Sequence, residues 1–452
     1  MLKSLFDLHR KERVPTLLMS AYFFLVITIF WILKPIKKSL FLGYYANRKL
    51  DATLGIFDSD ALLLAGPQAE LFAKVLNMIV AALAATLFVF LAKRFRREWL
   101  SYVFGSVFCL CFFVLQRFID QPSALSVWGF YLFGDLFNML MVAAFFAYLN
   151  DSVSPAMARR IYAFVVLGGV VGGVFGSTVV KARISVFANS TWLLLCAGLT
   201  LAIMGIAFLV SRLRLPTTRH AVEESEVVIL APLRTGLAGA HVVAASPYLC
   251  AIAAIVGIYE VVSTVMDYQF SATISHYLEG KAIGEQLASV FLVTNIVSLA
   301  VQVLLTRFVM QELGIRAALS VLPFAVLVVA GGFALMPLLW VGSSMSIADN
   351  ALNYSMNQSA KESLYVPTTA SAKYQAKAFI DIFVQRSAKA VGVVLSLIMS
   401  VWIADDLTAV RLLSLLVVAL SLVWLVLARY AGGRFDELSS STAPSHAPTP
   451  AE

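Results

Sequence analysis

The sequence predicts an all-α polytopic membrane protein with twelve transmembrane helices in two six-helix halves. The prediction depends on the composition, on the length of the apolar runs and on one long polar stretch in the middle of the chain. Of the 452 residues, 60% are hydrophobic and only 13% are charged, whereas soluble domains have about 45–50% apolar and about 25% charged residues. So little charge could not cover the surface of a large soluble domain, which excludes a soluble enzyme with a single anchor.

Twelve apolar runs are long enough to cross a bilayer as helices, which takes about 20 residues each. They are too long for the strands of a membrane β-barrel, which alternate over about 10 residues. The runs lie at residues 14–33, 71–92, 99–118, 128–149, 161–180, 191–210, 247–270, 287–306, 317–335, 337–358, 376–402 and 408–428.

The longest central polar stretch separates these runs into six and six. We therefore expect an N-terminal half over residues 1–210, a cytoplasmic linker over 211–245 and a C-terminal half over 246–430. The Ser/Pro/Ala-rich end of the chain predicts a disordered tail over 431–452. Two sets of six helices joined by a basic loop resemble the major facilitator class, whose halves surround a cavity at the bilayer midplane.

The distribution of lysine and arginine predicts the orientation, because short cytoplasmic loops carry an excess of both. With the N-terminus inside, twenty of the 34 such residues lie on the cytoplasmic side and seven on the other. Both termini are thus expected in the cytoplasm, with the protein in the inner membrane. The net charge of +8 then reflects topology, so no nucleic-acid partner is expected. We expect the protein to function as a monomer.

Small residues and cysteines inside the runs are interpreted as packing residues. The fifth run contains glycines three and four residues apart, which permit close helix crossing; a phosphate-binding loop would need them between a strand and a helix. The four cysteines lie inside apolar runs without the spacing of a metal site. The sequence predicts no metal, no cofactor and no enzymatic activity. The glycines are Gly168, Gly169, Gly172, Gly173 and Gly176, and the cysteines are Cys109, Cys111, Cys196 and Cys250.

Ionisable groups inside the runs are the functional candidates, because a charge in the bilayer interior normally faces a partner or a wet cavity. Lys34, Lys37 and Lys38 crowd the end of the first run, where Pro35 is expected to break the helix. Lys34 and Lys38 could instead extend to the headgroups. Asp135 lies within the fourth run, and Glu260 lies in the middle of the seventh, with Asp267 two turns later.

The tenth and eleventh runs add further polar residues. Lys377, Asp381, Gln385 and Lys389 follow one another at steps of four, which places them on one broad helix face, with Arg386 beside it. Lys377 and Asp381 could also simply pair with each other. The tenth run is typical of a cavity wall, and lysines with carboxylates facing one cavity suit an anionic substrate. Its polar residues are Ser343, Ser344, Ser346, Asp349, Asn350, Asn353, Tyr354, Asn357 and Gln358.

Four segments carry a resemblance to a known family. They are LKPIKKSL at 33–40, the region from 131 to 162 around Asp135, GIYEVV at 257–262, and the region from 353 to 381 with KESLYVP and AKAFID. Together they resemble the ATP/ADP antiporter family, the nucleotide transporters of plastids and obligate intracellular bacteria. Lys38 stands where the family has an aspartate, and Asp135 where it has a glutamate.

The resemblance implies a transporter that exchanges nucleotides by alternating access. It places Lys37 and Lys377 on the family's two functional lysines, and Asp135 and Glu260 on its carboxylates. We expect these acids to pair with these lysines when the site is empty. Two other functions stay open: a proton-coupled transporter of another organic anion, with Glu260 or Asp135 as the proton carrier, and a non-transporting membrane partner protein.

Overall fold

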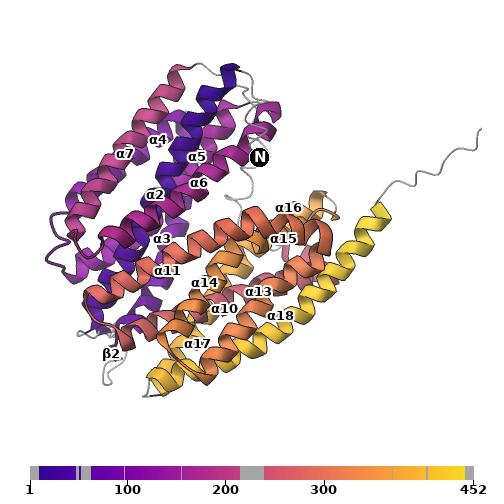
Figure 1. The fold of residues 1–452 in the computed structure, drawn as a ribbon. Helices are drawn as coiled ribbons and strands as arrows, with labels where there is room; N and C mark the ends of the chain where they lie inside the picture. The colour runs from indigo at the N-terminus through magenta and orange to yellow at the C-terminus, as the bar shows by residue number, and fades with distance from the viewer. Residues whose placement is uncertain are drawn as a thin grey trace, which may run out of the picture. The chain divides into compact units, whose positions relative to one another are not determined.

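The computed structural model describes residues 10–46, 50–51, 63–95, 97–153, 155–213, 239–368, 370–403 and 406–442. Helices make up nearly all of this part of the chain (Figure 1). The remainder of its regular structure is one antiparallel pair of two-residue strands, β1 (Leu50–Asp51) and β2 (Leu63–Leu64). The predicted all-α polytopic class is therefore confirmed. The first six helices are α2 (Arg10–Ala46), α3 (Gly66–Arg94), α4 (Arg97–Leu115), α5 (Ala124–Ser152), α6 (Pro155–Arg183) and α7 (Asn189–Arg212).

The later helices contain four short π-helical segments, η1 to η4, each with a wider turn than an α-helix. The seventh and eighth runs form α10 (Pro247–Tyr277) and α11 (Lys281–Ala300), followed by η1 (Val301–Leu305), α12 (Thr306–Phe308) and η2 (Val309–Leu313). The ninth and tenth form α13 (Gly314–Leu335), α14 (Leu339–Leu352), η3 (Asn353–Asn357) and α15 (Gln358–Ser363). The last two form α16 (Ala370–Phe379), η4 (Ile380–Val384), α17 (Gln385–Trp402) and α18 (Asp406–Thr442).

The twelve predicted spans fall on helical residues except at two ends, where residues 116–118 lie beyond α4 and residues 337–338 precede α14. Ten helical segments in the described part of the chain are long and apolar enough to cross a membrane. One of them, Lys281–Leu335, has 55 residues and contains two predicted spans, with Gly314 at a φ of 80° between them. The predicted span 337–358 is not among the ten, because its many polar residues lower its hydropathy.

The chain divides into two compact units, which are described separately. The first unit contains α2 to α7 together with Ser271–Ile296, and the second contains the described residues of Ala231–Phe270 and those from Val297 onward. In the first unit α2 contacts α5, α6 and α7, and in the second α13 packs against α14 and α18. The division into halves at 211–245 stays a prediction, and most of that linker lies outside the described residues.

Two expectations about helix ends were wrong. Pro35 does not end the first helix, since α2 continues to Ala46 with Pro35 inside it. Proline removes one backbone hydrogen bond, but helices that pack along α2 keep the segment helical beyond it. The tail predicted from residue 431 is helical as far as Thr442, because α18 extends past the apolar run; residues 443–452 lie outside the described part.

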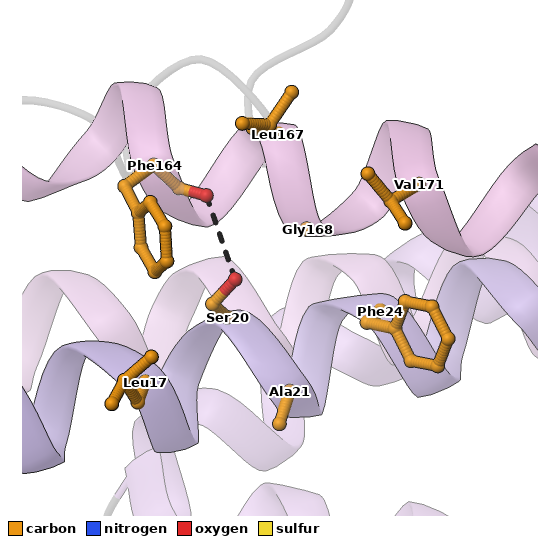
Figure 2. Close-up of a pocket in the computed structure, with 8 residues that line it drawn as sticks. All are labelled: Leu17, Ser20, Ala21, Phe24, Phe164, Leu167, Gly168 and Val171. Atoms are coloured by element: carbon orange, nitrogen blue, oxygen red, sulfur yellow. Dashed lines mark hydrogen bonds between the residues drawn. The ribbon is translucent and has the colours of Figure 1, made fainter. Parts of the chain in front are cut away.

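The glycines of α6 pack directly against α2, as the sequence predicts. A Cβ atom on Gly168, Gly172 or Gly176 would lie less than 3.0 Å from a carbonyl oxygen of α2, so only glycine permits this approach. Figure 2 shows the crossing at Gly168, where the Ser20 hydroxyl donates a hydrogen bond to the Phe164 carbonyl oxygen at 3.5 Å. A pocket of about 340 Å³ with a mainly apolar lining opens beside it.

Candidate functional site

The first unit holds a buried ion pair between α2 and α5. The ammonium of Lys37 contacts the carboxylate of Asp135, and the side chain of Lys37 is almost fully enclosed while that of Asp135 is one-third exposed. Gly134 makes room for the lysine, because a Cβ there would lie 2.9 Å from its Cδ. The expected pairing of these two residues is confirmed.

Two neighbours fix the geometry of this pair. The amide of Asn77 on α3 donates a hydrogen bond to Asp135 Oδ2 at 2.8 Å. The ring of Tyr131 lies 4.6 Å from Lys37 Nζ, and the Tyr131 carbonyl oxygen accepts from the same ammonium at 3.5 Å. The cation thus has a carboxylate, a carbonyl and an aromatic face around it, which together replace part of its hydration.

A second pair lies beside the first, one residue further along α2. Lys38 Nζ is 3.2 Å from Glu70 Oε1 on α3, and both side chains are buried. The Tyr131 hydroxyl donates to Glu70 Oε1 at 3.0 Å, and the Ser271 hydroxyl of α10 donates to Glu70 Oε2 at 2.7 Å. Lys38 therefore does not extend to the headgroups, the alternative raised by the sequence. Glu70 joins α2, α3, α5 and the end of α10.

Lys34 has an aromatic environment. Its Nζ lies 4.7 Å from the ring centroids of both Trp31 and Phe291, and 5.8 Å from that of Phe30. Three lysines within little more than one turn of α2 thus have three different surroundings. Lys37 and Lys38 face carboxylates, and Lys34 faces rings.

The second unit holds a separate charged cluster around α10. Glu260 is buried, and its Oε2 lies 3.5 Å from Lys389 Nζ on α17. The Ser263 hydroxyl, one turn further on, donates to Asp349 Oδ2 of α14 at 2.7 Å. Asp349 is itself buried. The partner expected for Glu260 was Lys377, and this expectation was wrong.

Lys377 has a different position and partner. Its ammonium is 2.6 Å from Glu362 Oε2, and both side chains are substantially exposed. Asp381 and Arg386 are also exposed. The single broad face predicted for these residues assumed a continuous α-helix, but η4 occupies Ile380–Val384 and adds a residue to the turn. This insertion shifts the residues after it relative to Lys377.

Among the lysines of the second unit that the structure describes, Lys361 is the buried one. It lies at the end of the helical stretch that begins with α14 and is 7% exposed. Its Nζ lies 5.0 Å from the ring centroid of Tyr259 on α10. Burial lowers the pKa of the Lys361 ammonium, while the negative charges of Glu260, Asp381 and Glu362 act in the opposite direction.

Asn353 and Tyr354, the remaining sequence candidates, begin the π-helical segment η3. The Asn357 amide donates to Asn353 Oδ1 at 3.0 Å, so the Asn353 side chain forms a hydrogen bond within its own helical stretch. Tyr354 is 49% exposed.

Sequence reasoning did not single out Glu70, Asn77 or Lys361. Glu70 directly precedes the second apolar run, and Lys361 lies just beyond the tenth, where hydropathy predicts a loop. Asn77 is a single amide in a long apolar run. Only one signal pointed to any of them: Lys361 and Glu362 lie inside the KESLYVP segment of the family resemblance.

Comparison with known proteins confirms the resemblance to ATP/ADP transporters. Residues 329–435 match the model of the family described as TLC ATP/ADP transporter, a range that includes Asp349, Lys361, Lys377 and Lys389. The chain is 21% identical to ADP,ATP carrier protein 1, chloroplastic, of Arabidopsis thaliana, over 72% of this chain and 57% of that protein. It is 22% identical to the plastidic ATP/ADP-transporter of Solanum tuberosum, over 71% and 56%. The chain thus spans somewhat more than half the length of these relatives.

Solved structures confirm the major-facilitator-like fold. The nucleoside transporter NupG aligns over 94% of this chain and 98% of its own, with a TM-score of 0.60 and 12% identity. A bacterial homologue of the lysosomal transporter Spinster, in an inward-facing conformation, aligns over 95% and 99%, with a TM-score of 0.55 and 11% identity. This protein is therefore a multi-pass membrane protein with a major-facilitator-like fold.

Proposed function

We propose that this protein exchanges nucleotides, such as ATP and ADP, or related phosphorylated anions across the membrane by alternating access. The observation that carries the proposal is the buried pair of Lys37 and Asp135 in a chain that resembles ATP/ADP carriers. A buried cation needs a compensating negative charge. A phosphate group can supply that charge in place of Asp135, and lysine binds phosphate well as a point charge.

The pair also offers a reason for exchange rather than one-way transport. When no substrate is bound, Asp135 neutralises Lys37, and Asn77 holds the carboxylate in place. A phosphate that takes over Lys37 releases Asp135, whose exposed third can then turn to water. We propose that the carrier reorients readily with substrate bound and slowly when empty. The charged cluster of the second unit, with Glu260 and Lys389, takes part in the same cycle.

The cellular setting belongs to the same proposal. We place the protein in the inner membrane with both termini in the cytoplasm, and we propose that a single chain is functional. Its partners are then the nucleotide and the lipid bilayer, without nucleic acid. Proton-coupled transport of another organic anion and a non-transporting partner role are tested by the experiment that follows.

Counter-exchange in liposomes tests the proposal. Purified protein is reconstituted into vesicles loaded with unlabelled ADP, and uptake of labelled ATP is followed. We expect uptake that needs internal nucleotide and does not need a pH gradient. Uptake that requires a proton gradient and no internal nucleotide would support proton coupling, and no uptake of any tested anion in either mode would support the non-transporting role. Empty and protein-free vesicles are the controls.

A further inference from the structure

We propose that Lys361 is the cation of the second unit that binds the substrate's phosphate groups, in place of Lys377. This inference rests on the proposed function and deepens it, because it assigns the ligand's anionic group to one residue. The sequence resemblance favours Lys377, so the two assignments lead to different results for the same pair of variants.

The first argument is the contrast in burial among the lysines of the cluster. Lys361 is 7% exposed, whereas the side chains of Lys377 and Lys389 are 35% and 53% exposed. A cation interacts more strongly with an anion when water is excluded, because the effective dielectric constant is lower. Of the three lysines, Lys361 therefore gains most from a bound phosphate.

The second argument is that the neighbouring lysines already have carboxylate partners. Lys377 is paired with Glu362 and Lys389 with Glu260. For Lys361, no ion pair with a carboxylate is recorded among the residues that the structure describes, and its recorded contact is the face of Tyr259 at 5.0 Å. A buried ammonium whose charge is balanced only by a ring and by more distant acids is a site that an anion can complete.

The third argument is that the surrounding acids do not exclude an anion. Glu260 is neutralised by Lys389, Glu362 is neutralised by Lys377, and Asp349 accepts a hydrogen bond from Ser263. Three of the four carboxylates near Lys361 are thus engaged elsewhere, and the fourth, Asp381, is exposed to water, which reduces their repulsion of an incoming phosphate. Lys361 is then the buried cation that attracts it.

Tyr259 gives the site its geometry. Its ring lies on α10 next to Glu260 and holds the ammonium of Lys361 by a cation–π contact. Because the ring is buried, it restricts where the lysine can place its charge. We therefore regard Tyr259 as a positioning residue that acts through Lys361.

The test compares nucleotide binding by purified full-length protein in detergent, measured by calorimetry with ATP, ADP and AMP. We expect Lys361→Gln to weaken ATP binding by about tenfold or more, the loss of a charge-assisted contact, and to weaken AMP binding less. Lys377→Gln is expected to have a clearly smaller effect. Lys281→Gln, an exposed lysine of the first unit, is the matched control and should bind as the wild type does.

Two further measurements separate loss of the ligand contact from loss of the fold. Without ligand, the melting temperature of Lys361→Gln should equal or exceed that of the wild type, because the variant removes a buried charge. The increase in melting temperature on adding ATP should be smaller in this variant. Tyr259→Phe, which keeps the ring, should bind ATP more tightly than Tyr259→Leu, which removes it.

The outcomes distinguish this inference from the proposed function. If Lys361→Gln binds ATP with the wild-type Kd, or if Lys377→Gln is the more damaging change, Lys361 is not the phosphate ligand, and nucleotide exchange still stands. If Lys361→Gln is unfolded without ligand, its charge is structural and the inference fails as well. Failure of the wild-type protein to bind any nucleotide would refute the proposed function and this inference with it.

Discussion

At the scale of single residues, the lysines of this protein differ in their surroundings more than in their chemistry. Lys37 and Lys38 are adjacent on α2, yet they pair with carboxylates on different helices, Asp135 on α5 and Glu70 on α3. Only the first of these carboxylates is partly exposed. The pair of Lys37 can therefore exchange its anion for a ligand, while that of Lys38 is enclosed by Tyr131 and Ser271 and has a structural role.

The Lys37–Asp135 pair predicts a non-additive effect on stability. Lys37→Gln or Asp135→Asn alone leaves one buried or half-buried charge uncompensated, and breaking a buried pair costs about 3–5 kcal/mol. The double variant removes both charges and should lose clearly less stability than the sum of the two single changes. Thermal unfolding in detergent measures this, and strictly additive losses would show that the two charges do not interact.

The same lysine predicts a dependence on the number of phosphates. Lys37→Gln should weaken binding of a nucleoside triphosphate more than that of a monophosphate, because the more highly charged ligand loses the larger attraction. A hydrogen bond to a charged group contributes about 1.5–3 kcal/mol, so the expected loss for ATP is roughly tenfold or greater. Titration with ATP, ADP and AMP checks the order. Equal losses for all three would indicate that Lys37 acts on the fold and not on the phosphates.

At the scale of elements, the two units differ in their helices: the first unit has a close crossing of α2 and α6, and the second has π-helical segments near its charged residues. In α6, glycines allow a close approach of α2 between Ser20 and Trp31, and α2 then continues as a helix through Pro35. In the second unit, η3 begins four residues after Asp349 and η4 begins three residues after Lys377. Each π-helical segment changes the direction of the side chains that follow it. Two of the four π-helical segments, η3 and η4, are thus found in the helices that carry the charged cluster.

The α2–α6 crossing predicts a sharp difference between two glycine substitutions. Gly172→Ala should destabilise the protein by about 1–3 kcal/mol, the usual cost of overpacking, because its Cβ would collide with the backbone of α2 at Phe24. Gly198→Ala on α7 is the matched control, since its Cβ would meet no atom within 4 Å; it should be neutral or slightly stabilising. Thermal melting of both variants in one detergent measures the difference, and equal melting temperatures would contradict the close crossing.

At the scale of the whole molecule, hydropathy predicts the helices well and the charged clusters only in part. Apolar runs coincide with the long helices of the described part of the chain, and the acid within the fourth run, Asp135, was expected to pair with Lys37, as it does. Glu70 was missed because a hydropathy boundary says nothing about which neighbouring helix a residue will face. The prediction that Glu260 pairs with Lys377 was wrong because a π-helical turn inserts a residue without changing the composition of the helix. The sequence spacing of Lys377 and Lys389 therefore gave no sign of the inserted residue.

The remaining prediction concerns how many times the chain crosses the bilayer. Twelve crossings require Lys281–Leu335 to cross twice, turning near Gly314, and the polar stretch that begins at Leu339 to cross once. Pro337 would then lie outside the cytoplasm and Thr442 inside it. Reporter proteins that are active on only one side, fused after each of these residues, measure both positions.

The two fusions together decide between the possible counts. If the 55-residue segment crossed only once and the polar stretch did not cross, ten crossings would also leave Thr442 inside, but they would bring Pro337 into the cytoplasm. If only one of these two conditions held, the count would be odd and Thr442 would lie outside. A fusion after Asp120, expected outside in every case, is the control for orientation. An outside signal at Pro337 combined with a cytoplasmic signal at Thr442 is therefore the result that twelve crossings require. We expect this result because twelve crossings place both Lys361 and Arg316 on the cytoplasmic side with the other basic loops.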